Sequence, residues 1–390
     1  MKKLLHIASL LFTICSYSQE SVFYSTNQFE NGTSSKFNLE VYNLNFIKNN
    51  EYFNFIADGY TLLGSQVYPQ VQYNNSKNTR FKAGVFIQKN FGENKIENIV
   101  PTFSFQYING NHEFIIGNFF ARNNHGTIEP ILASEKILRD DVIETGLQYK
   151  YKSSKLSLNT WLNWENYIRP DDDFKEVFTF GISANINATK NLTFPVQFIT
   201  RHKGGQINKK VRDELNIIDI YDIHNLATGV KYNFKLNTNN QFIVSYYYLL
   251  HTTNAPLAEH PFSNGNANYF KLRYLHRNFN FMLSYFKSNK FVTALGNDMF
   301  NSYSLKIDNN YWNGELDNRY ENLQEPNREL IFAKAFYENS LAKNIKIGVQ
   351  LEGFFQLNDS TETLVTQENK KNNFDYSYGV YVRFNDLFKL

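Results

Sequence analysis

The sequence predicts an all-β protein, a transmembrane up-and-down antiparallel β-barrel of about 18 strands, with about 16 as the alternative count. Three observations support this fold class. Polar and apolar residues alternate over unusually long stretches, no second long apolar run exists that would form a membrane helix, and the connections between the stretches are alternately short and long.

The segment 176–202 shows the alternation most clearly. From Phe178 to Ala188 every second residue is apolar, and the alternation resumes from Leu192 to Phe198 after a turn at 189–191. A period of two is typical of a strand with one apolar and one polar face. Strands of soluble sandwiches average about five or six residues, whereas a tilted strand that crosses a bilayer needs roughly nine to eleven. The length of this hairpin therefore favours a membrane location.

The beginning of the chain has the order of a secretory signal. A positively charged start is followed by an apolar run from Leu4 to Cys15 and by small residues before Gln19. A lipoprotein anchored at Cys15 is the less favoured alternative, because Ile14 stands where a small residue is usual. We expect residues 1–18 to be a signal peptide, residues 19–35 an N-terminal periplasmic lead and residues 36–390 the barrel.

The composition supports a barrel with a wet interior. The 390 residues are 42% hydrophobic and 17% aromatic, yet the mean hydropathy is negative. A chain this polar can reside in lipid only if half of each strand faces water. A secreted β-sandwich or propeller is the alternative. The formal net charge of +3 provides no global field for binding nucleic acid, so we expect no nucleic-acid partner.

Roughly nineteen segments qualify as candidate strands, with boundaries reliable to a few residues. Single-chain bacterial barrels have an even number of strands, so at least one candidate is wrong; the weakest are the first and the short pair around 308–310. The candidates are residues 37–46, 52–56, 65–73, 80–89, 99–108, 113–122, 142–152, 156–167, 177–188, 192–202, 225–236, 241–251, 268–277, 279–287, 302–307, 311–316, 328–337, 345–357 and 374–384.

The connections between the candidates alternate in length. Short ones rich in Asn and Gly, such as 109–111 and 189–191, are of the kind that closes a hairpin. Longer polar connections, such as 123–141 and 203–224, lie between them. Outer-membrane barrels have short periplasmic turns and long extracellular loops. We therefore expect an integral protein of the cell outer membrane, surrounded by lipid and lipopolysaccharide.

The last candidate strand contains a short terminal pattern. Ser377, Gly379, Val382 and Phe384 have the order polar, glycine, hydrophobic, aromatic, which resembles the β-signal that the barrel-assembly machinery reads on outer-membrane proteins. The pattern departs from its usual form because residues 385–390 follow the aromatic residue. The chain as a whole resembles porin-like outer-membrane barrels of Bacteroidota, and its strand count is similar to that of the alginate-export type. This likeness is architectural, since no diagnostic motif of that family is present.

Projecting the alternation places polar and charged residues of both signs in the lumen. Opposed charges would create a transverse field that orients polar solutes, so we expect a porin-like channel for small hydrophilic or saccharide-like solutes, and not an enzyme. A barrel without conduction, serving adhesion or assembly, is the first alternative, and a barrel enzyme is the second. The expected lumen-lining residues are Lys82, Glu113, Glu144, Gln148, Lys150, Glu165, Arg201, Lys231, Lys271, Arg273, Lys346, Glu352 and Arg383.

Catalytic and metal motifs are weak in this sequence. Its histidines form no recognisable Ser/His/Asp spacing and no metal-binding pair, so we expect no catalytic residue, no metal and no cofactor. The segment from Arg201 to Arg212 is the most basic stretch. It is interpreted as a constriction loop, an anion site or a solvated loop that faces anionic lipopolysaccharide. The histidines that are available as bases are His112, His125, His202, His224, His251, His260 and His276.

Overall fold

The structure is a computed structural model that describes most of the chain from residue 36 to the end. Residues 55, 121–124, 139–141, 171, 173, 206–219, 256–259, 305–310, 313–314, 317–323 and 358–372 are not described. The expected signal peptide and periplasmic lead, residues 1–35, lie outside the described residues.

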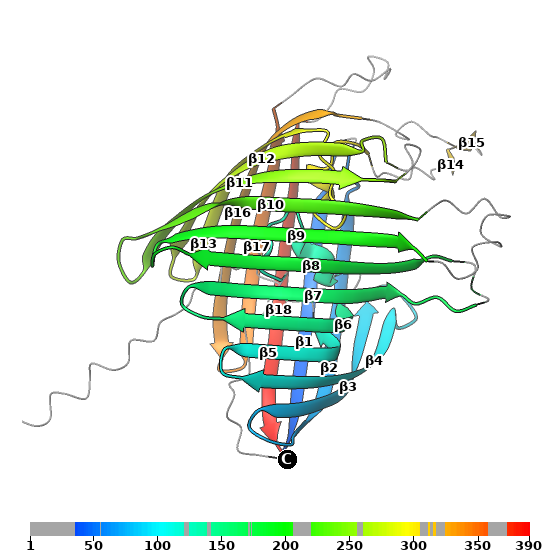
Figure 1. The fold of residues 1–390 in the computed structure, drawn as a ribbon, viewed down its shortest axis with the longest axis vertical. Coiled ribbons are helices and arrows are strands. Elements are labelled where there is room, and N and C mark those ends of the chain that lie inside the picture. The colour runs from blue at the N-terminus through cyan, green and yellow to red at the C-terminus, as the bar shows by residue number, and fades with distance from the viewer. Residues whose placement is uncertain are drawn as a thin grey trace, which may run out of the picture.

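Sixteen strands form one closed antiparallel barrel (Figure 1). Each strand pairs with its sequence neighbours, except that β13 pairs with β16, and β18 closes the barrel against β1. The barrel strands are β1 (Phe37–Glu51), β2 (Tyr60–Asn74), β3 (Thr79–Asn90), β4 (Asn98–Asn109), β5 (His112–Phe120), β6 (Ile143–Lys152), β7 (Leu156–Asn166), β8 (Glu176–Asn187), β9 (Leu192–Gly204), β10 (Tyr221–Lys235), β11 (Asn240–Thr253), β12 (Asn264–His276), β13 (Phe279–Asn289), β16 (Asn327–Ala342), β17 (Ile345–Gln356) and β18 (Phe374–Lys389).

The predicted all-β antiparallel barrel is confirmed, with the lower of the two expected strand counts. The first candidate strand, although weak in the sequence, is the full strand β1. Of the candidates at 52–56, 302–307 and 311–316, the described residues do not belong to barrel strands. Residues 52–54 and 56 follow β1 in its connection to β2, and β14 (Tyr311–Trp312) and β15 (Glu315–Leu316) pair only with each other. Short runs of alternating residues do not reveal whether they pair with a sheet or form a loop.

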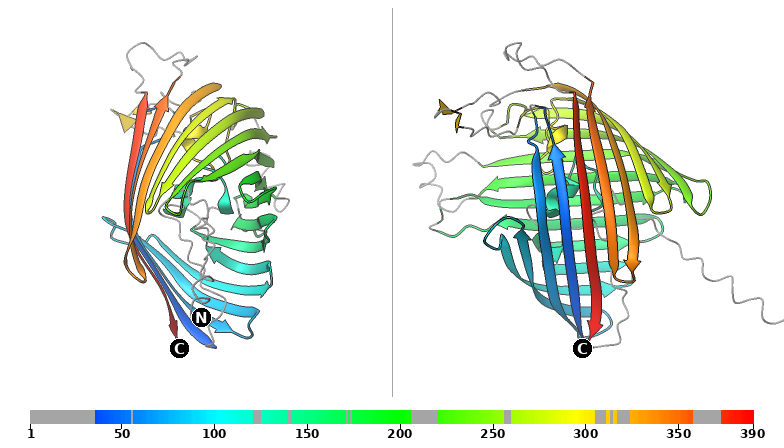
Figure 2. Two further views of the ribbon diagram at one scale, coloured as in Figure 1. Left: turned by 90° about the vertical axis from the view of Figure 1, so that its left-hand side faces the viewer. Right: turned by 180° about the vertical axis from the view of Figure 1, so that it is seen from behind.

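The barrel has one end with short turns and one with long connections. Both described chain ends lie at the short-turn end, where Asn38 of β1 pairs with Lys389 of β18, and β1 and β18 run side by side in Figure 2. The long-loop end therefore faces the cell exterior, as in other outer-membrane barrels. Among the described residues, no helix is long and apolar enough to span a membrane.

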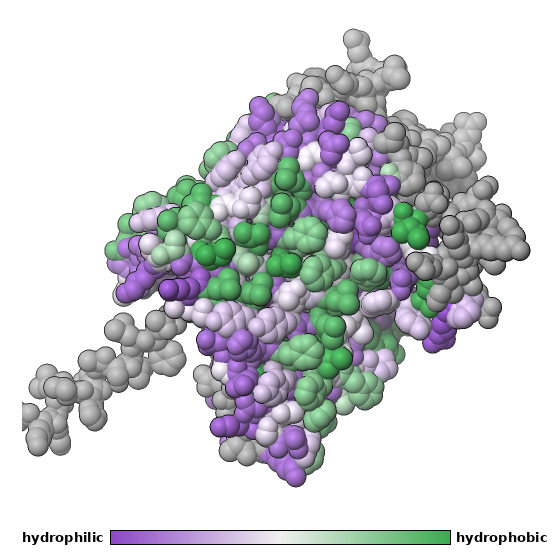
Figure 3. Space-filling view, viewed as in Figure 1, coloured by the Kyte–Doolittle hydropathy of each residue, from purple (hydrophilic) through white to green (hydrophobic). Residues whose placement is uncertain are grey.

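The two faces of the wall follow the alternation in the sequence. On β8, for example, Val177, Thr179 and Gly181 are buried on the inner face, while Phe178, Phe180 and Ile182 are partly exposed on the outer face. Hydrophobic residues spread over the wall formed by β5–β12 that faces the viewer in Figure 3. An outer face of this kind suits contact with hydrocarbon.

Two connecting segments fold back and fill the lumen. Residues 125–138 include the 3-10 helix η2 (Ser134–Leu138), and residues 290–304 include η3 (Asp298–Phe300). They bind each other, because the backbone N–H of Ala133 donates to the carbonyl of Leu295 at 2.9 Å and that of Asn297 donates to the carbonyl of Glu129 at 3.0 Å. We call residues 125–138 and 290–304 together the lumen plug.

The lumen plug forms an apolar core with the inner face of the wall. Its residues Ile131 and Phe300 are completely buried, and they belong to one cluster with Phe332 of β16 and Phe354 of β17. The rings of Phe332 and Phe354 stack with centroids 4.3 Å apart. A dry apolar core of this kind occupies space that an aqueous channel would need.

Candidate active site

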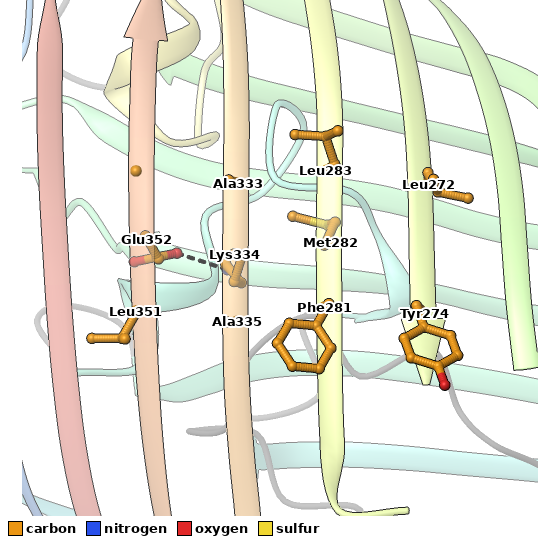
Figure 4. A pocket seen from close by; sticks show the side chains of 11 residues that line it. Leu272, Tyr274, Phe281, Met282, Leu283, Ala333, Lys334, Ala335, Leu351 and Glu352 are labelled. Carbon is orange, nitrogen blue, oxygen red and sulfur yellow. Dashed lines mark ion pairs between the residues drawn. The ribbon is translucent and has the colours of Figure 1, made fainter. Parts of the chain in front are cut away.

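Buried ion pairs attach the lumen plug to the wall. The Lys334 ammonium lies 2.8 Å from the Glu352 carboxylate (dashed in Figure 4) and 3.2 Å from that of Glu129 in the plug. Lys48 of β1 lies 2.5 Å from Glu352 and 3.6 Å from Glu135 of η2. Burial raises the pKa of Glu129, and the adjacent Lys334 ammonium opposes this shift. Because Lys334 and Lys48 of the wall pair with Glu129 and Glu135 of the plug, these ion pairs hold the plug in place.

The structure places the expected lumen-lining residues on the inner face of the wall and divides them among separate interactions. Glu144, Gln148, Lys271, Arg273, Glu352 and Arg383 are buried. Ion pairs join Lys82 to Glu40, Lys150 to Glu113, Arg201 to Glu165, and both Lys346 and Arg383 to Glu338. Lys271 lies over the rings of Tyr247 and Tyr269, and Lys231 is half-buried. These charges are not gathered around one open passage.

The four residues of the terminal pattern lie on β18 in strict alternation. Ser377 and Gly379 face inward, and Val382 and Phe384 face outward. The Ser377 hydroxyl donates to Glu352 at 3.1 Å and accepts from Lys48 at 2.8 Å. Recognition of this pattern by the assembly machinery stays a prediction.

One histidine of the lumen plug is held on every side. The ring of His125 stacks on that of Trp161 with centroids 3.7 Å apart. Its Nε2 lies 2.7 Å from the Glu144 carboxylate, and its Nδ1 lies 3.1 Å from the side-chain amide of Asn159. Trp161 fits because Gly181 leaves room: a Cβ at position 181 would lie 2.1 Å from the indole ring. A buried imidazole with both nitrogens in use is suited to a structural role.

A second histidine lies on the outer face, close to the long-loop end of the barrel. His202 is directly opposite Asp222 across the β9–β10 ladder, and its Nδ1 lies 2.8 Å from the Asp222 carboxylate. The ring stacks against the outer-face ring of Phe178 with centroids 4.7 Å apart. The side chains keep 19% and 33% exposure, so this pair, unlike His125 and Glu144, is accessible from the membrane side.

Two more polar residues lie beside this pair. Thr200 is two residues before His202 on the same face of β9, and it is directly opposite His224 of β10. Residues that are directly opposite in antiparallel strands have Cβ atoms about 4.5–5.5 Å apart. The His224 Nδ1 is buried and has no hydrogen-bond partner among the described residues. We call Thr200, His202, Asp222 and His224 the outer-wall cluster.

The outer-wall cluster begins where the apolar surface ends. Toward the periplasm, the outward residues of β9 from Phe198 back to Leu192 are apolar, and those of β10 continue with Leu226. Ten residues separate Leu192 from His202, which corresponds to roughly 25 Å of height for a strand tilted by about 40°. An outer-membrane barrel has an apolar band about 25 Å tall. The cluster therefore lies at the boundary between hydrocarbon and head groups of the outer leaflet.

The geometry of the pair suits general base catalysis. An ionised carboxylate only accepts hydrogen bonds, so the imidazole nitrogen that faces Asp222 carries the hydrogen. The lone pair of His202 is then on Nε2, the nitrogen directed away from the carboxylate, and this is the arrangement in which an Asp orients a catalytic His. Among the described residues, no group of three or more His, Cys, Asp or Glu side chains is arranged to hold a metal ion.

Sequence reasoning listed His202 and His224 as bases but missed their arrangement. The strand that carries Asp222 and His224 begins at Tyr221, four residues before the predicted start at Asn225, so both were assigned to a loop. The signal that identifies them is the spacing Asp-x-His, which puts both side chains on one face of a strand.

The fold and this cluster define an outer-membrane β-barrel with a filled lumen and a polar, base-containing site on its lipid-facing wall. The sequence matches the Lipid A 3'-O-deacylase-type family over residues 27–390, and the chain belongs to this family. Comparison with curated proteins gives no match.

Solved structures share the fold at low sequence identity. OmpTΔL8, a loop-deletion mutant of an outer membrane protein of Vibrio cholerae, is 8% identical with a TM-score of 0.51, over 90% of this chain and 100% of its own. The outer membrane protein OprD of Pseudomonas aeruginosa is 11% identical with a TM-score of 0.51, over 95% and 98% of the two chains. These similarities establish the barrel fold alone.

The family membership overturns two predictions. The porin-like channel is wrong as the function, and the expectation that the protein is not an enzyme is wrong as well, because the family is one of lipid A deacylases. The physical reason for the error is that polar residues face inward both in an open pore and in a barrel filled by its own loops. The second alternative, a barrel enzyme, agrees with the family.

Proposed function

We propose that this protein is an outer-membrane hydrolase that removes an ester-linked acyl chain from lipid A. The observation that carries this proposal is the family match, which spans residues 27–390. Water is the second substrate: the acyl–oxygen bond of the ester breaks, the acyl chain leaves as a fatty acid, and the sugar regains a hydroxyl group.

The location of the outer-wall cluster supports this activity. Lipid A is anchored in the outer leaflet, and its acyl esters lie between the sugar head group and the hydrocarbon. The cluster lies on the lipid-facing side of β9 and β10 at the same boundary. A substrate can therefore reach His202 by lateral diffusion, without leaving the membrane and without passing through the filled lumen.

The mechanism assigns one role to each member of the His–Asp pair. His202, through Nε2, takes a proton from a water molecule as that water attacks the ester carbonyl. Asp222 holds the ring at 2.8 Å and stabilises the imidazolium that forms. The imidazolium then returns the proton to the departing sugar oxygen. The stack on Phe178 limits rotation of the ring.

Thr200 offers a second route to the same products. Its hydroxyl is on the same face as both histidines, and a Thr hydroxyl can act as a nucleophile when a base is adjacent. Thr200→Val, which removes only the hydroxyl, separates the two routes. Activity within threefold of the parent supports water as the nucleophile, whereas loss comparable to that of His202→Gln assigns the attack to Thr200.

The test is acyl release by purified protein in vesicles that contain lipopolysaccharide, measured by mass spectrometry. His202→Gln should reduce release at least a hundredfold, and His276→Gln is the matched control. His276 is also an outward histidine with a 2.7 Å hydrogen bond, to Asn240, but it lies at the periplasmic end. No release by the parent protein would refute the function. Equal activity of both variants would refute the site and direct attention to the outer-face pair Asn49 and Thr61, whose side chains are 2.6 Å apart.

A further inference from the structure

Polar side chains continue from the outer-wall cluster onto the next two strands of the barrel. Thr252 of β11 is directly opposite His224 on one side and Asn264 of β12 on the other, and both Thr252 and Asn264 are exposed on the outer face. Asn254 follows β11 directly and is exposed as well. Its side-chain oxygen accepts the backbone N–H of Asp222 at 2.6 Å. We call Thr252, Asn254 and Asn264 the amide patch.

Aromatic rings border the outer-wall cluster on its other side. Phe178 of β8 is directly opposite His202, and Trp164 of β7 is directly opposite Phe178. The rings of Trp164 and Phe178 stack with centroids 5.2 Å apart, and Trp164 keeps 36% exposure. The base His202 therefore lies between an aromatic surface on β7 and β8 and the amide patch on β11 and β12.

The pairing register shows which of these two sides is deeper in the membrane. One continuous row of paired residues begins at Asn38, near the short-turn end of β1, and reaches Thr253 at the long-loop end of β11. Such rows therefore rise toward the cell exterior from β1 to β11. Because neighbouring strands are about 4.8 Å apart and tilted by about 40°, each strand along a row adds about 3 Å of height. Trp164, two strands before His202, consequently lies about 6 Å deeper, and Asn254, at the end of the second strand after it, lies about 6 Å higher.

The chemistry of the amide patch favours an uncharged ligand that is rich in hydroxyl groups. Amide and hydroxyl side chains donate and accept hydrogen bonds, as sugar hydroxyls do. Among the described residues, no hydrogen bond uses the Thr252 hydroxyl or the amide nitrogen of Asn254, so both are available to a ligand at this exposed surface. The patch contains no charged side chain, and the adjacent Asp222 carboxylate repels an anionic group.

We propose that the amide patch binds the saccharide head group of the lipid substrate through its sugar hydroxyls, while the acyl chain to be released lies over the rings of Phe178 and Trp164. This inference rests on the proposed function and deepens it, because it fixes the orientation of the substrate around His202. In lipid A the sugar lies above the ester and the acyl chain lies below it. The amide patch on the higher side and the rings on the deeper side match that order.

Binding of defined lipids tests this inference without turnover, because the protein carries His202→Gln. Native mass spectrometry of the detergent-solubilised protein gives dissociation constants for lipid A, for lipid A without its phosphates, and for phosphatidylcholine. Loss of hydrogen bonds reduces affinity, so Thr252→Val together with Asn264→Leu should weaken binding of both forms of lipid A roughly tenfold. Binding of phosphatidylcholine, which has no sugar, should change less than threefold.

Matched controls separate the sugar contacts from the fold and from general contact with lipid. Thr228 is an exposed outer-face residue of β10 that lies between Leu226 and Val230, within the apolar surface, and Thr228→Val should leave binding of lipid A unchanged. Thr252→Ser keeps the hydroxyl and should bind lipid A within threefold of the protein without this change. Unchanged binding of lipid A in the double variant overturns the inference.

Two further results identify the recognised group and its side of the base. Loss of binding when the phosphates are removed would make phosphate the recognised group, and this result overturns the inference. A larger loss in Trp164→Leu than in the double variant would put the sugar on the rings, which overturns it as well.

Failure of this inference is distinguishable from failure of the proposed function. If lipid A binds through the amide patch, but the protein with His202 restored releases no acyl chain, the saccharide assignment stands and the proposed hydrolysis fails. If acyl release occurs and the double variant binds lipid A normally, the hydrolysis stands and the saccharide assignment fails.

Discussion

Asp222→Asn is the sharpest test of the outer-wall cluster, because it changes charge and hydrogen bonding at almost constant shape. In the parent protein the carboxylate accepts a hydrogen bond from Nδ1 of His202 at 2.8 Å. An asparagine amide can instead donate to that nitrogen, which moves the imidazole hydrogen to Nε2. The ring would then present a hydrogen, and not a lone pair, to the water that it must activate.

The size of the effect follows from the exposure of the pair. The same change in a buried serine-protease triad lowers kcat by about ten thousandfold. Here the His202 and Asp222 side chains retain 19% and 33% exposure, so water competes for the ring and a smaller loss of roughly 10²- to 10³-fold is expected. This corresponds to about 2.7–4.1 kcal/mol of transition-state stabilisation. Stability should change by less than about 1 kcal/mol, because exposed ion pairs contribute little.

The assay compares kcat and KM for acyl release from lipopolysaccharide in vesicles, with folding checked by migration on gels before and after heating. We expect kcat to fall and KM to stay within threefold, since Asp222 does not contact the substrate in the proposed mechanism. A kcat within threefold of the parent would refute the role of the pair. A rise in KM and a fall in kcat, together with altered gel migration, would show instead that Asp222 supports the local fold.

Three further outcomes test the fold. The mature protein should begin at Gln19, and mass spectrometry of protein purified from outer membranes that retains residues 1–18 would contradict this. Ile182→Arg should impair refolding into vesicles by roughly 2–4 kcal/mol because it puts a charge in hydrocarbon, whereas Asn185→Arg on the inner face should not; equal tolerance would mean that the strand register is wrong. Lys334→Met should lower the free energy of unfolding in urea by about 3–5 kcal/mol, since Glu129 is left buried without that partner. A change below about 1 kcal/mol would contradict the role of the Lys334 ion pairs in attaching the lumen plug to the wall.

The sequence predicted the wall of the barrel well because the wall obeys a local rule. Period-two alternation, as from Phe178 to Ala188, is imposed by the pleat and needs no knowledge of partners. The same rule correctly separated the faces of Lys271 and Arg273 from those of Phe270 and Leu272. Strand ends were less accurate, and the four residues omitted from the start of β10 removed Asp222 and His224 from the surface on which they lie.

The lumen plug was not predictable from local pattern, because it depends on contacts between distant segments. Ile131 and Phe300 are far apart in the sequence and become buried together only when two loops enter the barrel. In the sequence those loops are polar enough to resemble solvated extracellular loops. Their buried apolar residues are too few and too irregularly spaced to produce a periodic signal.

The outer-wall cluster shows that the face of the barrel wall on which a polar side chain lies carries more functional information than the mere occurrence of a polar residue in the strand. Inward charges such as Lys271 and Arg273 have water or a packed lumen around them, so barrels of any function tolerate them. A polar group on the outer face is costly within the hydrocarbon, and it is tolerated only at the margins of the apolar band. There His202 and Asp222 lie on the outer face near the long-loop end, where the apolar surface of β9 ends. An inward base would require the lipid to enter a lumen that Ile131, Phe291 and Phe300 already fill, and the lipid-facing wall is therefore the side on which a hydrolase of this architecture can meet its substrate.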